Sequence, residues 1–184
     1  MNTTYLCLGS NVGNKEANIA DAVRLLEKKV KITKLSALYK TEPLDYEQQD
    51  FFLNQVVEAE TELSLEELFK AILSVERTLG KNISIRFGPR NIDIDILFYN
   101  DSIANKQIAY NKDSFLLQVP HPRLHTRKFV LMPLAEIAHG LMHPLIKRNI
   151  KQLLDNLDKS NKSKKVERLH QDGTANKKQE ASSV

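Results

Sequence analysis

Two aspartates, Asp93 and Asp95, stand in an otherwise apolar run that the sequence predicts to be a strand over residues 92–99. Because side chains alternate along a strand that rises about 3.3 Å per residue, both carboxylates should project from one face, roughly 6.5 Å apart. Aspartate is a poor strand former and like charges repel, so this placement is unfavourable by itself. A bound cation would remove the penalty, and two carboxylates with a phosphate-bearing substrate suit Mg²⁺. The alternative is a solvated outer face of an edge strand.

A cluster of cations precedes this strand. Lys81, Arg86 and Arg90 fall within ten residues, and Gly88-Pro89 predicts a turn that returns the arginines toward the acidic strand. Metal on one side and forked guanidinium donors on the other would bind a polyphosphate. Simple Arg–Asp pairing is the alternative, but three cations exceed the charge of two carboxylates. We therefore expect these cations to bind an anion.

A histidine, His121, lies in the proline-rich segment VPHPRLHTR at residues 119–127. Its spacing from His125 would suit zinc on a helix, but Pro122 disfavours helical geometry there, so we exclude zinc. The prolines should instead fix His121 as a hydrogen-bond donor beside Arg127. A packed or surface histidine is the alternative.

One acidic residue, Glu76, falls on the apolar stripe of a predicted helix. A charge inside a buried stripe needs a partner, so Glu76 either braces a loop arginine from behind or extends to solvent near the helix end. The segment GSNVGNK at residues 9–15 lacks the spacing and the ending of a Walker A loop. The phosphates must therefore be held elsewhere.

The elements that must position these residues alternate between strand and helix patterns. Strands are predicted at residues 5–8, 32–39, 53–60, 92–99 and 116–119, with a loop at 100–115. One helix should follow the N-cap Asn14, a second should follow the Ser64–Glu67 capping box and end at Gly80, and a third should carry the apolar stripe at 145–157. Because the helices are too few for every strand pair to be parallel, we expect an α+β sandwich around a largely antiparallel sheet.

Length and composition fit one domain and a tail. The chain has 184 residues, of which 41% are hydrophobic and 27% charged, and this composition excludes collagen-like and wholly disordered classes. Residues 158–184 hold seven Lys or Arg and four Asp or Glu, so they carry +3 of the net charge of +4. We expect a domain at 1–157 and a basic, disordered tail at 158–184, because the tail has few large apolar residues. The tail either aids solubility or forms a basic arm for RNA or another anionic surface.

The sequence also bears on location. It has no run of about 18 apolar residues, and residues 1–11 lack signal-peptide features, so we expect neither a membrane partner nor export. The single cysteine, Cys7, cannot form an internal disulfide, which fits a reducing cytoplasm.

Taken together, the motifs resemble those of the 6-hydroxymethyl-7,8-dihydropterin pyrophosphokinase family. The similarity spans residues 3–157, and its ordered segments are GSN at 9–11, TEPL at 41–44, FFLN at 51–54, ER at 76–77, RFGPR at 86–90, IDIDI at 92–96 and PHPR at 120–123. The resemblance implies a ferredoxin-like fold, a monomer and a kinase-type transferase of folate biosynthesis. Its substrates would be ATP and 6-hydroxymethyl-7,8-dihydropterin, with pyrophosphate transferred to the hydroxymethyl group and AMP released.

The resemblance also implies a role for each matching residue. Asp93 and Asp95 would bind two Mg²⁺ with ATP, and Arg86 and Arg90 would act with them in catalysis. The residues implied to bind ATP are Lys81, Ile96, His121 and Arg127. The residues implied to bind the pterin are Thr41, Leu44, Phe52, Asn54, Phe87, Asp93 and Phe129. Glu76 would support these residues from behind.

Within the pterin set, the ring would stack between Phe52 and Phe129, and Asn54 would pair with its polar edge. Two departures from the family pattern stand out. Phe87 occupies a position where Trp is usual, and the loop after Gly80 has fewer arginines than usual. The smaller number of loop cations should weaken phosphate contacts without changing the reaction.

Two other functions compete with this one. A nucleotidyltransferase also combines Gly-Ser with an Asp-x-Asp strand, but there the strand follows soon afterwards, whereas 83 positions separate Ser10 from Asp93. An RNA-binding α+β module would use the basic tail. The chain lacks the exposed aromatic motifs of RNA-recognition modules, so we expect no nucleic-acid partner.

Overall fold

The computed structural model describes residues 1–43, 48–80, 88–160 and 165–169 of the chain. Within these ranges the central sheet has six strands: β1 (Asn2–Ser10), β2 (Lys31–Leu35), β3 (Tyr39–Thr41), β4 (Phe52–Thr61), β5 (Asp93–Tyr99) and β8 (Val166–Arg168). The hydrogen-bonded order is β5-β1-β4-β3-β8, and β2 pairs with the far end of β4. Every pairing in this sheet is antiparallel. The antiparallel sheet predicted from the sequence is therefore confirmed.

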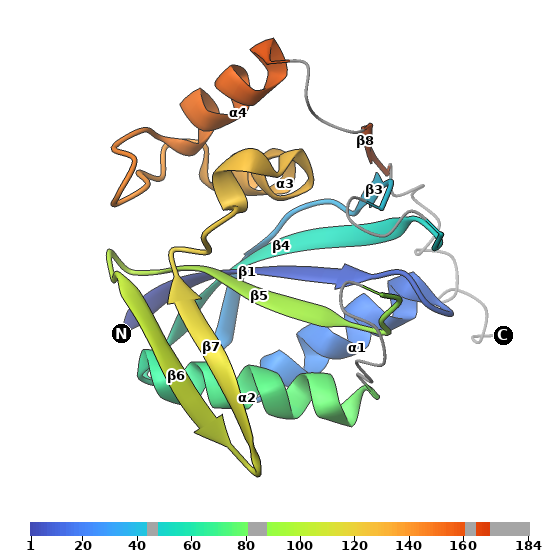
Figure 1. Ribbon diagram of the computed structural model, residues 1–184, viewed down its shortest axis with the longest axis vertical. Helices are drawn as coiled ribbons and strands as arrows, with labels where there is room; N and C mark the ends of the chain where they lie inside the picture. Colours follow the sequence, from blue (N-terminus) through green and yellow to red (C-terminus); the bar gives the residue numbers. More distant parts are fainter. Residues whose placement is uncertain (44–47, 81–87, 161–164, 170–184) are drawn as a thin grey trace, which may run out of the picture.

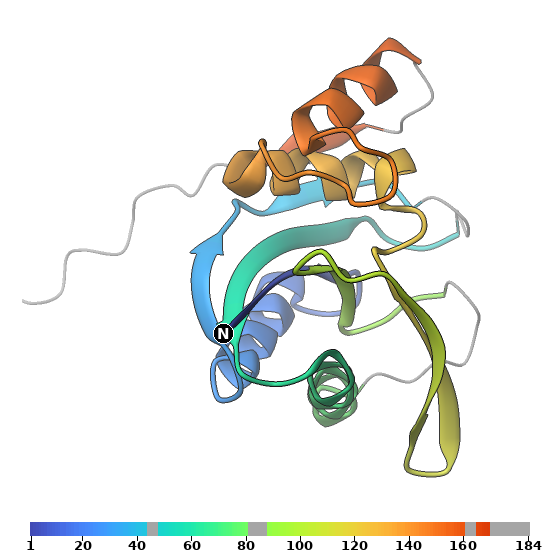
Figure 2. The same cartoon turned by 90° about the vertical axis from the view of Figure 1, so that its left-hand side faces the viewer.

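Helices cover both faces of the sheet, as Figure 1 shows from one side and Figure 2 after a quarter turn. Helices α1 (Lys15–Leu26) and α2 (Leu65–Thr78) lie on one face, and α3 (Lys128–Ala138) lies on the other with α4 (Ile150–Lys159) packed on it. The sequence of elements β1-α1-β2-β4-α2-β5, with β1 and β4 at the centre, is the ferredoxin-like arrangement. A hairpin of β6 (Ala104–Tyr110) and β7 (Asp113–Val119) and a 3₁₀ turn at Leu124–Thr126 follow β5.

Local sequence signals account for where the first two helices begin. Asn14 caps α1 by accepting a hydrogen bond from the Ala17 N–H at 3.1 Å. Ser64 and Glu67 form the predicted capping box of α2, each side chain accepting from the other's backbone N–H. These contacts satisfy N–H groups that a helix start leaves without partners, so both helix starts are confirmed.

The alternation predicted for β5 is also confirmed. Ile92, Ile94 and Ile96 are at most 5% exposed and pack into the core under α1 and α2. Leu97 and Phe98 both pack into a second core under α3 and α4. These consecutive residues share one face because the register against β1 shifts between the Tyr5–Phe98 and Leu6–Ile96 pairs. Hydrophobic cores on both faces thus hold β5 in place.

The structure corrects the prediction of a loop at residues 100–115. Most of this segment belongs to the β6–β7 hairpin, which turns at Asn111 with a left-handed φ of 55°. Its strands are mostly polar, so hydrophobic alternation could not reveal them. Cross-strand pairing and a few buried side chains, among them Ile108 and Leu117, hold the hairpin.

Three other boundaries differ from the sequence prediction. The strand predicted at 32–39 is two strands separated at the buried Ser36. There the Val56 N–H donates to the Ser36 side-chain Oγ at 3.0 Å, and this contact interrupts the regular backbone pairing with β4. Helix α3 was not predicted, since its nearly uniform apolar sequence shows no stripe and Pro133 lies inside it. The last helix begins only at Ile150, after its own capping residue Asn149.

The C-terminal segment also departs from the prediction of a tail without structure after residue 157. Helix α4 continues to Lys159, and β8 at Val166–Arg168 pairs with β3. The reason is that strand pairing supplies backbone hydrogen bonds that a count of apolar residues does not register. The remaining tail residues, 161–164 and 170–184, lie outside the described part of the chain. No helix within the described residues is both long and apolar enough to cross a membrane.

Candidate active site

Strand register brings the central polar residues of the site together. On the face of the sheet toward α3, Gly9 of β1 pairs with Asn54 of β4 on one side and with Asp93 of β5 on the other. Two residues back along β1, Cys7 pairs with Asp95 in the same way. Directly paired residues of antiparallel strands point to the same face, so amide and carboxylates share one surface.

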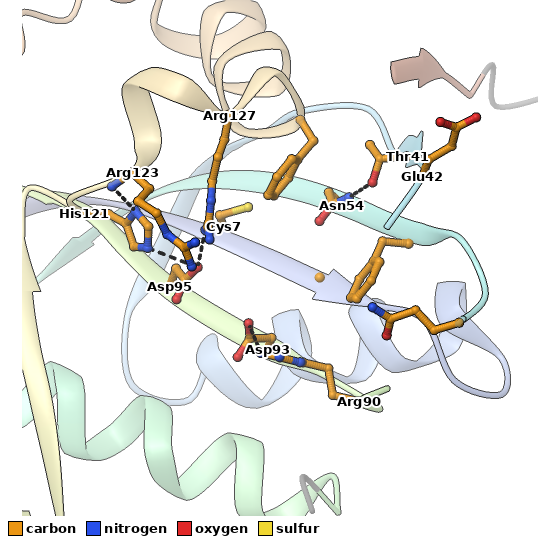
Figure 3. A pocket seen from close by; sticks show the side chains of 14 residues that line it. Cys7, Thr41, Glu42, Asn54, Arg90, Asp93, Asp95, His121, Arg123 and Arg127 are labelled. Carbon is orange, nitrogen blue, oxygen red and sulfur yellow. Dashed lines mark hydrogen bonds and ion pairs between the residues drawn. The ribbon is translucent and has the colours of Figure 1, made fainter. Parts of the chain in front are cut away.

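This surface is the floor of a pocket of about 240 Å³, which Figure 3 shows from close by. The lining residues come from β1, β3, β4, β5, the first turn of α3 and the segments that follow β3, precede β4, precede β5 and lead into α3. They are Cys7, Gly9, Thr41, Glu42, Gln49, Phe52, Asn54, Arg90, Asp93, Asp95, His121, Arg123, Arg127 and Phe129. The volume is slightly below the roughly 300–1,000 Å³ usual for ligand pockets, so it suits a small heterocycle or part of a larger substrate.

The two carboxylates are partly exposed and face cations. Arg90 Nη1 lies 2.7 Å from Asp93 Oδ2, and these side chains are 19% and 26% exposed. Asp95, which is 37% exposed, has its Oδ2 3.7 Å from His121 Nε2 and 3.8 Å from Arg127 Nη1. The Arg–Asp pairing considered as an alternative does occur at Arg90. Nevertheless, Arg123 and Arg127 also reach the pocket, so it remains rich in anion-binding groups.

His121 is oriented by backbone contacts on both sides. Its N–H donates to the Leu97 carbonyl at 3.0 Å, and its Nδ1 accepts from the Arg123 N–H at 3.2 Å. Because Nδ1 is an acceptor, the proton of the neutral ring resides on Nε2, which faces Asp95. Burial, followed by the nearby charges of Arg127 and Arg123, lowers the pKa of His121 to about 4. The ring is therefore neutral at physiological pH, and its Nε2–H is available as a hydrogen-bond donor.

Glu76 reaches the site from behind β5. This residue of α2 is 3% exposed, and its Oε1 accepts a hydrogen bond from the Ile94 N–H at 2.7 Å. Burial rules out the alternative in which Glu76 extends to solvent. Glu76 thus binds the backbone N–H of the residue between the two aspartates. Arg86, a loop arginine that Glu76 could brace, lies outside the described residues.

The opposite end of the pocket is amide and aromatic. Asn54 is 3% exposed, and its Nδ2 donates to Thr41 Oγ1 at 2.8 Å. Phe52 and Phe129 line the same end, from β4 and from the start of α3. A flat heterocycle gains from aromatic faces, and an oriented amide offers it a carbonyl oxygen. This end therefore has the chemistry to bind a flat polar heterocycle.

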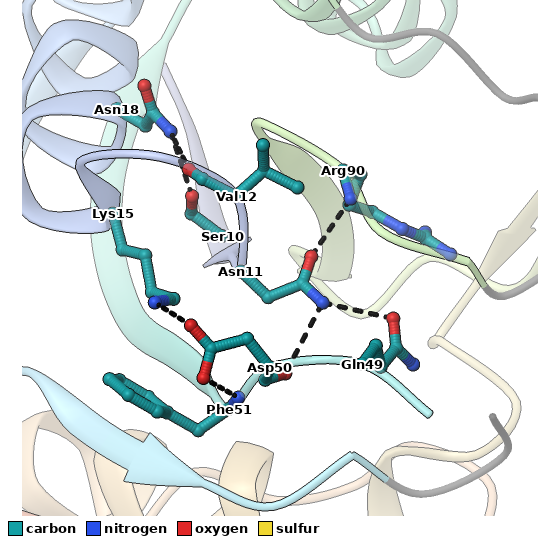
Figure 4. A network of polar contacts seen from close by, with 9 residues as sticks. All are labelled: Ser10, Asn11, Val12, Lys15, Asn18, Gln49, Asp50, Phe51 and Arg90. Atoms are coloured by element: carbon teal, nitrogen blue, oxygen red, sulfur yellow. Dashed lines mark hydrogen bonds and ion pairs between the residues drawn. The ribbon is translucent and has the colours of Figure 1, made fainter. Parts of the chain in front are cut away.

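A buried amide connects the pocket to the loop after β1, as Figure 4 shows. Asn11 is 3% exposed; its Oδ1 accepts from the Arg90 N–H at 2.9 Å, and its Nδ2 donates to Gln49 Oε1 at 3.0 Å. Nearby, Lys15 lies over the Phe51 ring at 4.0 Å and pairs with Asp50. These contacts hold the GSN segment, the entry to β4 and Arg90 as one unit.

The only thiol of the chain lies on the pocket floor. Cys7 is 6% exposed, and burial, reinforced by the charge of Asp95, raises the pKa of its thiol well above the usual range. The thiolate is the reactive form of cysteine, so this thiol is inert as a nucleophile. Cys7 instead contributes a small, apolar surface next to the carboxylates.

The structure brings together most of the residues that the sequence analysis selected. Those lining the pocket are Thr41, Phe52, Asn54, Arg90, Asp93, Asp95, His121, Arg127 and Phe129. Leu44, Lys81, Arg86 and Phe87 lie outside the described residues. Ile96 does not line the pocket, because its side chain is 5% exposed in the core on the other face of the sheet.

Sequence reasoning missed five lining residues: Cys7, Gly9, Glu42, Gln49 and Arg123. Gly9, Glu42 and Arg123 lie inside the recognised motifs, so their neighbours could have pointed to them. Cys7 and Gln49 carry no such signal. Cys7 is found only through its pairing with Asp95.

The donor set fits hard cations that bind together with a substrate. Asp93 and Asp95 supply carboxylate oxygens, and within the described residues no group of three or more His, Cys, Asp or Glu is placed to hold a metal ion. Mg²⁺ commonly takes one or two carboxylates and completes its coordination with phosphate oxygens and water. The residues present therefore fit Mg²⁺ delivered with a nucleotide.

Fold and site together define an α+β enzyme of the phosphate-transfer class. The model of the 7,8-dihydro-6-hydroxymethylpterin-pyrophosphokinase family matches residues 5–139. The chain is 40% identical over 152 residues to the 2-amino-4-hydroxy-6-hydroxymethyldihydropteridine pyrophosphokinase of Aquifex aeolicus, covering 83% of this chain and 90% of the relative. The enzyme of the same name from Bacillus subtilis is 42% identical over 139 residues, covering 74% and 78%. The chain thus belongs to the 7,8-dihydro-6-hydroxymethylpterin-pyrophosphokinase family.

Solved structures agree on the fold. A crystal structure of HPPK-DHPS in complex with substrates superposes with a TM-score of 0.68 at 16% identity, covering 86% of this chain. The wild-type HPPK-DHPS of Plasmodium falciparum gives 0.66 at 19% identity, covering 85%. The chain spans less than half of those proteins, 44% and 43% respectively. They support the α+β fold of the sheet and its helices.

Proposed function

We propose that the chain transfers pyrophosphate from MgATP to the hydroxymethyl group of 6-hydroxymethyl-7,8-dihydropterin, releasing AMP, in folate biosynthesis. The observation that carries this proposal is the pocket in which one sheet face presents Asp93 and Asp95 beside cations at one end and Asn54 beside aromatic rings at the other. A phosphate chain and a flat polar heterocycle need these two environments side by side. Family membership supplies the reaction that joins them.

The acidic end is proposed to hold the nucleotide. Asp93 and Asp95 would bind two Mg²⁺, which supply charge neutralisation on the triphosphate and lower the pKa of the attacking hydroxyl. Arg90 and Arg127 would bind phosphate oxygens through forked donors, together with Arg86 and Lys81 of the preceding loop. Arg90 would then exchange part of its present contact with Asp93 for the nucleotide. The Nε2–H of His121 would donate a hydrogen bond to the nucleotide.

The other end is proposed to hold the pterin. Phe52 and Phe129 would stack on the ring, and Asn54, held by Thr41, would pair with its polar edge. Leu44 and Phe87 are expected to complete this site on the evidence of the family resemblance alone. Ile96 would contribute to the nucleotide site only through its backbone, because its side chain is in the core.

Catalysis is proposed to rest on positioning. The pterin hydroxyl would attack the β-phosphorus in line and lose its proton to water. The new O–P bond would form as the bond from the β-phosphorus to the oxygen of the departing AMP breaks. Phosphoryl-type transfer depends mainly on alignment and charge stabilisation, and effective molarities of well-aligned groups are large. The residues of this chain would therefore act by holding both substrates, and no side chain need serve as general base.

The same proposal includes the surroundings of the reaction. We expect a monomer acting in the cytoplasm, without a nucleic-acid partner. The buried single cysteine fits a reducing compartment. Sedimentation of the purified chain with and without substrates tests the monomer, since a dimer would double the apparent mass.

Phosphorus NMR of ATP, Mg²⁺ and 6-hydroxymethyl-7,8-dihydropterin with the purified protein tests the function. We expect AMP and a pterin diphosphate in equal amounts, and neither product without magnesium. Release of inorganic pyrophosphate with a nucleotidylated product would indicate the nucleotidyltransferase alternative. Absence of any pterin diphosphate at high enzyme concentration would overturn the proposal.

A further inference from the structure

The C-terminal strand β8 lies against the pterin end of the pocket. Its residues pair with β3 in an antiparallel ladder in which Val166 is opposite Thr41 and Arg168 is opposite Tyr39. Figure 1 shows β8 beside β3, on the side of β3 away from β4. The family model ends at residue 139, so β8 belongs to the part of the chain beyond that match.

The pairing makes a very short strand internal to the sheet. β3 is only three residues long, and its other edge pairs with β4. Without β8 its outer N–H and C=O groups would have no strand partner, and so short an edge strand is marginal. The Leu169 N–H extends the contact by donating to the Leu38 carbonyl at 2.8 Å. β8 thus holds the segment that ends at Thr41.

A polar hub connects the same strand to α3. Glu136 of α3 accepts from Arg168 Nη2 at 3.0 Å, from the Tyr39 hydroxyl at 2.8 Å and from the Ala37 N–H at 3.1 Å. Burial and the hydrogen bond to Glu136 raise the pKa of Tyr39 to about 12, so its hydroxyl remains a donor throughout the physiological range. One carboxylate therefore ties β8, β3 and α3 together.

The contacts of β8 and Glu136 lead to two residues of the pocket, Thr41 and Phe129. From β3 the path leads to Thr41, whose hydroxyl accepts from Asn54 Nδ2 at 2.8 Å. From Glu136 it leads along α3 to Phe129, one of the aromatic residues of the pocket. The contacts of Glu136 therefore connect the element that carries Phe129 to the strand that contacts Asn54. The C-terminal strand contributes Arg168 to these contacts.

We infer that β8 is a positioning element of the pterin subsite, which fixes β3 and α3 relative to each other through strand pairing and the Arg168–Glu136 contact. This inference rests on the proposed function. It assigns Arg168 as a positioning residue, since Arg168 acts through Glu136 and Tyr39 and does not line the pocket. Loss of β8 should weaken pterin binding and leave the nucleotide end, built on β5 and the segment before α3, nearly unchanged.

The test compares two shortened chains and three point variants in steady-state kinetics. A chain ending at Lys165 lacks β8, and a chain ending at Gly173 keeps it and serves as the matched control. The chain ending at Lys165 loses the Arg168–Glu136 hydrogen bond and the pairing of β8 with β3. We expect this loss to raise the KM for pterin by roughly five- to tenfold. The KM for ATP should change less than about twofold, and the chain ending at Gly173 should match the full chain.

Point variants separate positioning from general destabilisation. Arg168→Ala should raise the pterin KM, and Arg168→Lys should recover most of the loss because it keeps a cation. Glu167→Ala, on the same strand, is the control, since Glu167 is exposed and has only a 3.9 Å contact with Lys165. A merely structural role would lower the amount of active enzyme, and hence kcat, with both KM values unchanged; that pattern would overturn the inference.

Hydrogen exchange keeps this test independent of the reaction. Amides of residues 39–41 should exchange faster in the chain ending at Lys165 than in the chain ending at Gly173, while amides of β1 should not differ. If the full chain forms no pterin diphosphate, the proposed function fails, and the exchange comparison still decides whether β8 holds β3. Equal exchange in β3, or an equal pterin KM in an active enzyme, would overturn the inference alone.

Discussion

The carboxylate of Glu76 accepts a hydrogen bond from the Ile94 N–H at 2.7 Å, and Ile94 is the residue between the two aspartates of the site. Among the described residues β5 is the edge strand and pairs with β1 on one side alone, so an N–H on its other side has no strand to receive it. A buried N–H without an acceptor is costly, and an ionised acceptor makes a strong bond. A helix side chain thus fixes the strand that carries both candidate metal ligands.

Replacing Glu76 by Leu should destabilise the fold and lower turnover together. The Ile94 N–H would lose this acceptor at a site that is 3% exposed, and we expect a loss of about 1–3 kcal/mol in the free energy of unfolding. Glu76→Gln keeps a carbonyl oxygen and should recover part of it. Urea unfolding measures the change, with exposed Glu16→Leu on α1 as control. A Glu76→Leu protein as stable as its parent would contradict this role.

Asp95→Asn should abolish most of the activity without loss of stability. Neutralising one of two like charges on a strand relieves repulsion, so the thermal midpoint should stay or rise. Loss of a metal-binding carboxylate should reduce turnover by at least about 100-fold, which corresponds to about 2.7 kcal/mol or more of transition-state stabilisation. Asp93→Asn should behave similarly in turnover, but it also removes the partner of Arg90.

The control for these substitutions is Asp113→Asn, at an exposed position of the hairpin. Initial rates at increasing Mg²⁺ would show whether the aspartate variants need more metal. Near-normal turnover of both variants at low Mg²⁺ would eliminate the proposed metal site.

Gly9→Ala should weaken pterin binding specifically. A Cβ at this position would lie 3.0 Å from Asn54 Oδ1, closer than nearly all real Cβ contacts. The amide cannot retreat freely, because its Nδ2 is held by Thr41. We expect the KM for pterin to rise by roughly tenfold, equivalent to the loss of one good hydrogen bond, with the KM for ATP little changed.

A matched control for this prediction is Gly140→Ala, because a Cβ there meets no atom within 4 Å. Both variants should melt close to the parent. Equal rises in the KM values for pterin and ATP would show that the added methyl group disturbs the whole pocket and not the amide.

Stability should fall in acid partly through Glu136. Partial burial acts to raise the pKa of this carboxyl, but hydrogen bonds from Arg168, Tyr39 and the Ala37 N–H outweigh it, so the pKa lies below the ordinary value of 4.5. The folded state therefore binds this proton less readily than the unfolded chain. The resulting stabilisation is complete above pH 4.5 and is lost as the pH falls through the lowered folded pKa.

Glu136→Gln has no proton to bind, so its stability should change less than that of the parent as the pH drops through this acidic range. Urea unfolding at a series of pH values measures the difference in slope. Glu62→Gln, exposed after the end of β4, is the control and should follow the parent. Parallel curves for Glu136→Gln and the parent would contradict the prediction.

The features that could be read from the sequence are those that depend on local pattern. Alternation along residues 92–96 placed Asp93 and Asp95 on one face, and side-chain oxygens at Asn14 and Ser64 marked helix starts. Features that depend on long-range pairing could not be read. The position of Cys7 beside Asp95 follows from strand register, and each strand of a polar hairpin gains its hydrogen bonds from its partner strand.

The same limit applies to contacts between distant segments. Nothing in the local pattern around Glu136 indicates that it meets Arg168, 32 residues away, or that the basic end of the chain contributes a strand. A composition that is too polar to form a core can still add to an existing sheet edge, because the ladder supplies the hydrogen bonds.

The central strand β1 shows a gradient of side-chain size on the face toward α3, from Tyr5 through Cys7 to Gly9. Tyr5, which is partly buried, packs edge-on against Phe98 of the core, Cys7 fills part of the space beside Asp95, and Gly9 fills none. The decreasing size of the side chains along β1 thus leaves the space that forms the pocket. Widening or narrowing that space would need changes at only two alternate positions of one strand, which makes them the natural place to retune which ring the protein accepts.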